Sequence, residues 1–319
     1  MKKILQYLVF IIIQIPFVPL AIIGVILAAY KEMVVSKKLG VSFTAGQAIQ
    51  PKWYLHYFRV REDKDTVLFM RNLPIESELG FWLLLLPSII ANRLTGFSLP
   101  LFVIPEEGKE NLVTFINMRI VNFDNIVEKY SSEVEQMVLM GGGYDLRFIK
   151  YTKGKNLKVF DIDQLKTLQL KLDVMKKAGI ESDWITYVPI DFREESWVDK
   201  LIENGFDKTK KTYFHWESVS PFLEEKLVKD TLRKMSEISP KGSVIGQDSY
   251  SKDWIKKLAK FAEKMGEPFI SGIDMSTNAE GTIRSLLDEC GFELKECIFA
   301  GHKSKSGKPF YAITVAVKK

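Results

Sequence analysis

The chain has few of the residues that build disulfide or metal frameworks. It contains two cysteines, Cys290 and Cys297, and three histidines among 319 residues. Two cysteines rule out a disulfide framework and a multi-cysteine zinc site. No group of histidine, cysteine and aspartate has the spacing of metal ligands. We therefore expect reduced thiols and no metal centre.

The chain also lacks a large excess of one charge sign. Its 45 lysines and arginines stand against 40 acids, for a net charge of +5, and the two signs are interspersed. This balance does not call for a nucleic-acid partner. The mean hydropathy of −0.01 is too low for a polytopic membrane protein. At roughly 100–200 residues per domain, the length allows one large domain or two ordinary ones.

One segment lacks charged residues altogether. Residues 8–30 contain Gln14 as their one strongly polar side chain, and lysines flank the segment on both sides. About 20 apolar residues cross the hydrocarbon core of a bilayer, whereas a cleaved signal peptide has an apolar core of about 7–15. A buried core helix is disfavoured because the run has no polar face. We predict a membrane anchor in residues 1–36, bent or folded back at Pro16 and Pro19.

Residues 37–116 show no strand–helix alternation, and we predict a helical cover that binds the acceptor. They include a second apolar stretch, residues 79–90, which is too short to span comfortably. Pro87 is expected to break it. We interpret this stretch as a helix packed on the main domain, with an interfacial helix as the alternative.

From residue 117 to residue 319 the pattern alternates between apolar strands and amphipathic helices. Alternation of this kind predicts an α/β fold, here a Rossmann-like doubly wound sheet that is mostly parallel. The last two strands are joined by a loop with no room for a crossover helix, so they should form an antiparallel hairpin. The expected strands cover residues 135–140, 158–163, 184–190, 212–216, 242–248, 292–299 and 310–317.

Glycines or acids follow four successive strands of this predicted sheet. In open α/β sheets, ligands bind beyond the carboxyl ends of the strands. Glycines allow a ligand to approach the backbone closely, and a carboxylate about 20 residues later accepts hydrogen bonds from ribose hydroxyls. An acid followed by an aromatic residue suits a purine with its exocyclic amine. The residues are Gly141, Gly143, Asp161, Asp163, Asp191, Phe192 and Glu217.

This set fits a nucleoside that carries an amino acid, which describes S-adenosylmethionine. Asp163 is the preferred ribose ligand, but strand alternation puts Asp161 on the same side and leaves both open. A dinucleotide is the weaker alternative. The segment that begins with Gly141 and Gly143 lacks the third glycine of a Rossmann fingerprint, and Asp145 would bring negative charge to the phosphates.

These residues resemble the leucine carboxyl methyltransferase family, which includes polyketide-type O-methyltransferases. Residues 138–147 match the family's V-x-L-G-A-G-x-D-T-R motif, residues 160–163 its F-E-V-D, and residues 216–219 its W-E-G-V. The resemblance implies an S-adenosylmethionine-dependent methyltransferase that acts on a carboxylate or hydroxyl. It also implies that Arg119 binds the methionine carboxylate of the cofactor. Gly142, Leu146 and Ser218 depart from the family pattern.

The acceptor is not specified by these motifs. We expect a small or lipid-like molecule, met at the membrane by a domain on the cytoplasmic side. A hydroxyl acceptor would need a general base, for which His215 is the candidate, although a lone histidine is more often structural. Two other functions stay open: a catalytically inactive, membrane-tethered scaffold with a methyltransferase fold, and a nicotinamide-dependent oxidoreductase.

Overall fold

A computed structural model describes residues 2–41, 43–192, 196–264, 268–304 and 307–319. The chain divides into two compact units, each described by itself. The helical unit comprises Met1–Pro105, Leu112–Met118 and Leu170–Glu181, and the sheet unit comprises Glu106–Asn111, Arg119–Gln169 and Ser182–Lys319. The predicted boundaries at residues 36 and 116 remain predictions.

The helical unit begins with one long helical run. It consists of α1 (Lys2–Gln14), the 3-10 turn η1 (Ile15–Phe17), α2 (Val18–Tyr30), the π-helical η2 (Lys31–Val35) and α3 (Ser36–Leu39). The two prolines therefore produce a 3-10 turn within a continuing helix. The segment Ile4–Leu39 is long and apolar enough to cross a membrane, with a mean hydropathy of 2.7 and 6% of its residues buried.

Four shorter helices and a 3-10 turn complete the N-terminal part of this unit. They are α4 (Phe43–Gln47), α5 (Gln50–Tyr57), α6 (Lys64–Asn72), α7 (Glu78–Thr95) and η3 (Pro100–Phe102). The expected break at Pro87 is wrong, because α7 continues through it. Its ends are well fixed: Ser77 accepts a hydrogen bond from the Gly80 amide, and Gly96 closes the helix at a φ of 74°. Packing of α7 on both α2 and α5 stabilises the interrupted helix.

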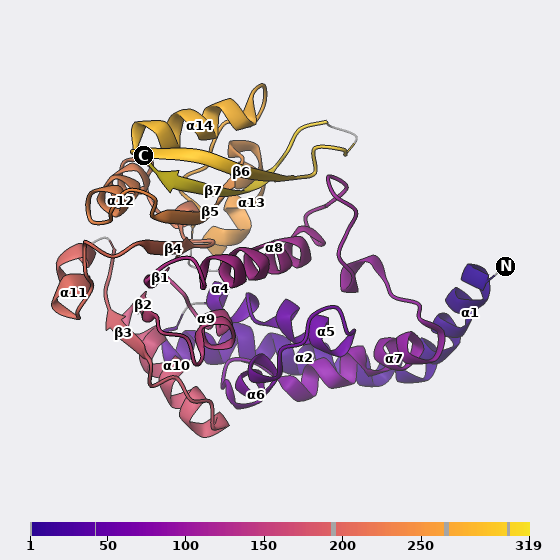
Figure 1. The fold of residues 1–319 in the computed structure, drawn as a ribbon. Helices are drawn as coiled ribbons and strands as arrows, with labels where there is room; N and C mark the ends of the chain where they lie inside the picture. The colour runs from indigo at the N-terminus through magenta and orange to yellow at the C-terminus, as the bar shows by residue number, and fades with distance from the viewer. Residues whose placement is uncertain (1, 42, 193–195, 265–267, 305–306) are drawn as a thin grey trace. The chain divides into compact units, whose positions relative to one another are not determined.

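The sheet unit contains seven strands in the order β3-β2-β1-β4-β5-β7-β6 (Figure 1). The first five strands in this order are parallel to one another, and β7 pairs antiparallel with both β5 and β6. The predicted α/β class and the C-terminal hairpin are therefore confirmed. The strands are β1 (Gln136–Met140), β2 (Lys158–Asp163), β3 (Ile185–Pro189), β4 (Thr212–Trp216), β5 (Val244–Tyr250), β6 (Phe292–Ala300) and β7 (Tyr311–Lys318).

Helices pack on both faces of this sheet. One face forms a continuous apolar core with α11 (Trp197–Glu203), α12 (Glu225–Glu237) and α14 (Ala279–Glu289). The other face contacts the sheet-unit part of α8 (Phe115–Tyr130), α9 (Arg147–Thr152) and α13 (Lys252–Lys264). The turn η4 (Ser220–Phe222) follows β4, and α10 (Leu165–Ala178) follows β2.

The strand order determines at which edge of the sheet a ligand can bind. Strand β1 lies between β2 and β4, so the chain leaves the centre of the sheet in opposite directions. At such a switch point the loops after the strands diverge and leave a crevice. Since β1 to β4 are parallel, the glycines and acids that follow them meet at this one edge.

Candidate functional site

The loop after β1 is built tightly around its three glycines. Gly141 and Gly143 have φ values of 69° and 51°, the left-handed region that favours glycine. A Cβ on Gly141 would lie 2.6 Å from a methyl group of Val219, and one on Gly142 would lie 2.4 Å from a methyl group of Leu139. Larger side chains would therefore not fit at Gly141 and Gly142, because Val219 and Leu139 pack directly against this loop.

The structure separates the two acids of β2 by depth. Asp161 is 2% exposed and lies beneath the loop, with its Oδ1 2.8 Å from where a Gly142 Cβ would be. Asp163 is half-buried at the rim, where its Oδ2 accepts a hydrogen bond of 2.6 Å from the Gly143 amide. Its Oδ1 accepts one of 2.6 Å from the Gln164 amide. Both aspartates share a face, but Asp163 is the one that reaches the crevice.

The end of β3 lies beside Asp163. The Ile190 amide donates to the Asp163 carbonyl at 2.8 Å, which continues the parallel pairing past the strand. Gln164 bridges the two strand ends, since its Nε2 lies 3.5 Å from Asp191 Oδ2. Asp191 and Phe192 are both half-buried. The structure thus brings together the predicted glycines, Asp163, Asp191 and Phe192 at one edge.

Glu217 follows β4 and joins two arginines. Its Oε1 lies 2.9 Å from Arg119 Nε, and its Oε2 lies 2.6 Å from Arg147 Nη1. Burial alone would raise the pKa of Glu217, but the charges of Arg147 and Arg119 outweigh it and lower that pKa below its ordinary range. Glu217 is therefore ionised at neutral pH and orients both guanidinium groups.

Arg147 occupies the centre of a set of groups that could hold a metal ion by distance alone. Asp145, His215 and Glu217 have ligand atoms within 4.8 Å of one another. Arg147 Nη1 lies 3.4 Å from Asp145 Oδ2 and 3.0 Å from His215 Nε2, and Arg147 Nε lies 2.7 Å from Asp124 Oδ1. The guanidinium already supplies the positive charge that a cation would bring.

His215 is a fully buried part of this network. It is 0% exposed and lies between the rings of Phe123 and Phe148, at 4.8 and 5.8 Å. A guanidinium only donates, so Nε2 accepts from Arg147 and we assign the ring hydrogen to Nδ1, 3.0 Å from the Tyr213 hydroxyl. Burial lowers the pKa of His215. Its role as a general base stays a prediction, one that this burial disfavours.

Arg119, the predicted carboxylate ligand, lies at the ends of β4 and β5. Its Nη1 donates to the Ser218 hydroxyl at 2.7 Å and to the Tyr250 hydroxyl at 3.0 Å. Arg119 is 7% exposed and pairs with Glu217. Arg119 is thus held at the same edge as the glycine loop.

Asp248 and Ser218 were missed as site residues by the sequence reasoning. Asp248 Oδ1 accepts from the Ser218 amide at 2.8 Å, and its Oδ2 accepts from the Tyr311 hydroxyl at 3.0 Å. Burial raises the pKa of Asp248 to about 6. Ser218 has a φ of 59° where the family has glycine, a strained conformation for a serine. The signal was present, because Asp248 lies towards the end of the fifth strand, where the rule about strand ends also applies.

The buried network carries an excess of acid. Among the residues that the structure describes in this network, two arginines, Arg119 and Arg147, face four carboxylates, an excess of two negative charges when all are ionised. A site of this sign in a low-dielectric setting favours a cationic ligand. The four acids are Asp124, Asp145, Glu217 and Asp248.

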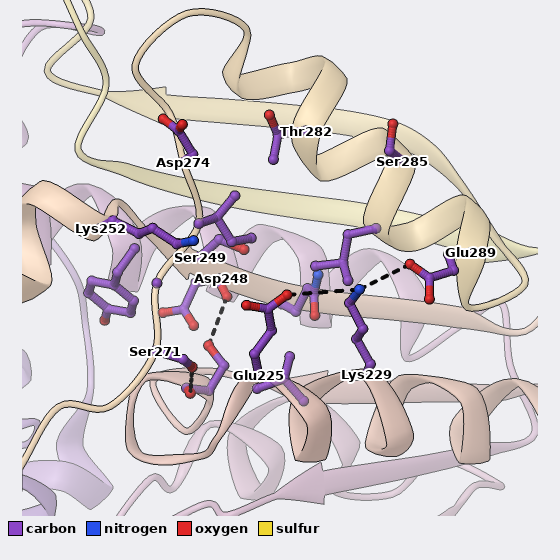
Figure 2. Close-up of a pocket in the computed structure, with 17 residues that line it drawn as sticks. Glu225, Lys229, Asp248, Ser249, Lys252, Ser271, Asp274, Thr282, Ser285 and Glu289 are labelled. Carbon is purple, nitrogen blue, oxygen red and sulfur yellow. Dashed lines mark hydrogen bonds and ion pairs between the residues drawn. The ribbon is translucent and has the colours of Figure 1, made fainter.

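A second hollow lies between α12, α14 and the end of β5. It has a volume of about 280 Å³. Figure 2 shows Lys229 on its wall between two acids, Glu225 at 3.8 Å and Glu289 at 3.1 Å. The Ser271 hydroxyl donates to the Ser220 carbonyl at 3.1 Å on another wall. Both charge signs line this pocket, and it contains none of the predicted cofactor residues.

Comparison with known proteins identifies the same region. Residues 102–236 match the family model described as leucine carboxyl methyltransferase. A protein of Mycobacteroides abscessus, provisionally named an S-adenosyl-L-methionine-dependent methyltransferase, is 29% identical over 136 residues, 42% of this chain and 45% of that protein. The similarly named YktD of Bacillus subtilis is 28% identical over 148 residues, 43% of this chain and 48% of that protein.

Solved structures resemble the chain more distantly. A DUF574 family protein from Streptomyces avermitilis covers 64% of this chain and 84% of its own, at 15% identity and a TM-score of 0.49. The chain spans about half the length of the curated relatives it matches. The resemblance predicted from the motifs is confirmed: residues 102–236 of this chain have the sequence pattern of the leucine carboxyl methyltransferase family.

Proposed function

We propose that this chain is an S-adenosylmethionine-dependent methyltransferase that methylates an oxygen of a small or lipid-like acceptor. The observation that carries the proposal is the glycine loop after β1, with Asp163 held beside it by the Gly143 amide at 2.6 Å. The matches to methyltransferases support the same activity. The oxygen acceptor is inferred from the family resemblance and from no contact in the structure.

The residues at this edge suit this cofactor in chemistry and charge. Gly141 and Gly143 give the loop a left-handed backbone that a nucleoside can approach closely, while Val219 and Leu139 pack against it from the protein side. The half-buried carboxylate of Asp163 suits two ribose hydroxyls, and Asp191 with Phe192 suits the adenine. Arg119 is placed for a carboxylate, and the acidic excess of the network suits a ligand that carries sulfonium and ammonium charges.

The sulfonium of the bound cofactor supplies the methyl group and an already good leaving group. The chain's own contribution is then to bind and orient: the glycine loop and Asp163 fix the nucleoside, and Arg119 fixes the opposite end. In-line alignment of the acceptor oxygen within about 3–3.5 Å of the methyl carbon accounts for most of the required acceleration. A carboxylate acceptor needs no general base, whereas a hydroxyl acceptor does.

We further propose that the chain is attached to a membrane through its N-terminal helical run, with the sheet unit on the cytoplasmic side. The exposed apolar length of Ile4–Leu39 supports this attachment. Lys37 and Lys38 at its end are exposed and can meet anionic headgroups. A membrane-bound enzyme meets lipid-like acceptors at a raised local concentration.

Transfer from a methyl-labelled donor to membrane and soluble extracts tests the activity. We expect label in the lipid fraction with the full chain. Treatment with base identifies the acceptor, because a methyl ester releases methanol and a methyl ether does not. Absence of transfer to any extract by a chain that binds the donor would favour the inactive scaffold. Donor binding and NAD binding, measured separately, distinguish the methyltransferase from an oxidoreductase.

A further inference from the structure

We propose that the N-terminal helical run lies in the plane of the membrane surface and does not cross the bilayer. Helix α7 then lies on the side of the run that faces away from the lipid. The inference rests on the proposed membrane attachment and adds the geometry of that attachment. Three observations carry it: the run packs on α7, its polar residues Gln6, Gln14 and Glu32 contact the protein, and both ends of α7 return to the same helical unit.

The run and α7 form an antiparallel pair along their length (Figure 1). Gln6 Nε2 donates to the Thr95 carbonyl at 2.5 Å near one end. At the other end the backbones of Gly24 and Gly80 nearly touch, since a Cβ on Gly24 would lie 2.5 Å from the Gly80 carbonyl oxygen. Small residues at a helix crossing allow this close approach. The pair is therefore a built interface and not a loose contact.

Polar residues of the run lie on the side that faces the protein. Gln6 bonds Thr95, Gln14 Oε1 lies 3.5 Å from the Ser88 hydroxyl, and Glu32 Oε1 accepts from Gln50 at 2.9 Å. With Gly24 included, residues 6 and 24, and likewise residues 14 and 32, are 18 residues apart, which is five turns of a helix. The two pairs are offset by about 80° around the axis, so all four positions lie within one side of the run. They mark one protein-facing stripe.

The opposite side of the run is entirely apolar over a long distance. Side chains on it are strongly exposed, among them Ile12 at 66%, Ile22 at 57% and Ile26 at 61%. An apolar helix face of this length belongs in a protein core or in lipid. The 36 residues of Ile4–Leu39 would extend about 54 Å, nearly twice the thickness of a bilayer's hydrocarbon core. This length does not suit an upright crossing.

Both flanks of α7 pack on the same short helix, α5. Before α7, Glu76 accepts hydrogen bonds of 3.2 Å from Gln50 at the start of α5. After α7, Phe102 contacts the ring of Tyr54 at 5.4 Å and stacks on Phe58 at 4.1 Å. The two ends of α7 therefore lie on one side of any membrane. Since the long run lies along α7, it is held on that side as well.

Sidedness of labelling tests the in-plane arrangement. In a Cys290→Ser/Cys297→Ser background, single cysteines are placed ahead of Met1, at Lys38 and at Glu296, and probed with a membrane-impermeant maleimide. We expect all three to be labelled from the same side, in inverted vesicles and not in intact cells. Labelling of the N-terminal cysteine from the side opposite to Lys38 would show a spanning helix and overturn the proposal.

Binding of the full chain to vesicles of phosphatidylcholine and phosphatidylglycerol tests whether the exposed apolar side of the N-terminal run contacts lipid. We expect Ile12→Lys/Ile22→Lys to lower the bound fraction about tenfold, because its lysines meet the apolar boundary. Leu165→Lys is the matched control, at 54% exposure on α10, and should bind like the wild type. Unchanged binding of the double variant would contradict the proposed face.

Wild-type protein that does not bind vesicles and sediments as an oligomer would overturn both the attachment and its geometry. The exposed apolar side of the N-terminal run would then bind a second copy of the chain. Such a result would leave the methyltransferase activity unaffected, because cofactor binding is measured without lipid. Attachment with labelling on opposite sides would overturn the in-plane geometry alone.

Discussion

The sheet unit and the helical unit use polar side chains in opposite ways. In the sheet unit, charged groups gather at the ends of parallel strands, where Arg119, Arg147 and Glu217 form one buried network. In the long helical run, Gln6 and Gln14 turn toward α7 and leave an apolar outer face. We propose that the first arrangement binds a charged small molecule and that the second contacts lipid. The position of the polar groups, more than their number, separates the two functions.

The largest effect should come from breaking the charge network of the sheet unit. Arg147→Met removes the guanidinium that Asp124, Asp145 and Glu217 share, and leaves three buried carboxylates without it. Loss of one partner of a buried ion pair costs about 3–5 kcal/mol. We expect the free energy of unfolding to fall by that amount, as measured by urea denaturation.

Arg284→Met provides the control for that experiment. Arg284 pairs with Glu280 at 2.6 Å on the exposed surface of α14. Exposed ion pairs contribute about 0–1 kcal/mol, so this variant should unfold close to the wild type. Equal losses for the two arginines would mean that the network around Glu217 is solvated and not buried.

A smaller effect should appear as a pH dependence. The pKa of Asp248 is raised from 3.8 to about 6 by burial, so the folded state holds this proton more tightly than the unfolded state. Stability from this group is full below pH 3.8 and is lost as pH rises through about 6. Over this window the wild type should lose up to about 3 kcal/mol relative to Asp248→Asn.

Denaturant unfolding of both proteins between pH 4.5 and 7 captures about 2 kcal/mol of this difference. The lower limit matters because Glu217 has the opposite sign: its lowered pKa gives stability that is lost as pH falls below its ordinary value of 4.5. A constant gap between wild type and Asp248→Asn across the range would contradict a raised pKa at Asp248.

The smallest effect concerns the strained serine next to Glu217. Ser218 has a φ of 59°, which costs a side-chain-bearing residue about 1 kcal/mol relative to glycine. Ser218→Gly and Ser218→Ala both remove the hydroxyl, but only the first removes the strain. We expect Ser218→Gly to be about 1 kcal/mol more stable than Ser218→Ala, measured by thermal or urea unfolding.

The same pair of substitutions at Ser285 should give the reverse order. Ser285 is exposed within α14, where glycine is about 1 kcal/mol less favourable than alanine. If alanine is also better at residue 218, the backbone there is not left-handed and the assigned strain is wrong.

Much of the sheet unit could be predicted because its signals are local. Buried apolar runs bounded by glycines and acids located all seven strands to within two residues, as for β5, expected at residues 242–248 and found at Val244–Tyr250. The glycines and Asp163 met as expected, because parallel strands end at one edge. Asp161 is more deeply buried than Asp163 because the loop after β1 folds over it. The alternation of side chains along a strand does not predict this difference in burial.

Long-range contacts account for what could not be predicted. Pro87 is an intrinsic helix breaker, yet α7 continues through it because packing on α2 and α5 outweighs the lost hydrogen bond. Arg119 pairs with Glu217, 98 positions away along the chain, a contact that no local pattern indicates. The protein-facing stripe of the N-terminal run can be recognised only when the contacts of the run with α7 are known.

Calorimetric titration with S-adenosylmethionine tests the central claim about the glycine crevice most directly. The account predicts one site in the wild type, affinity about tenfold to a hundredfold weaker in Asp163→Ala, from the loss of charged hydrogen bonds, and wild-type affinity in the exposed control Asp183→Ala. No heat from the wild type, or equal affinity in all three proteins, would contradict it.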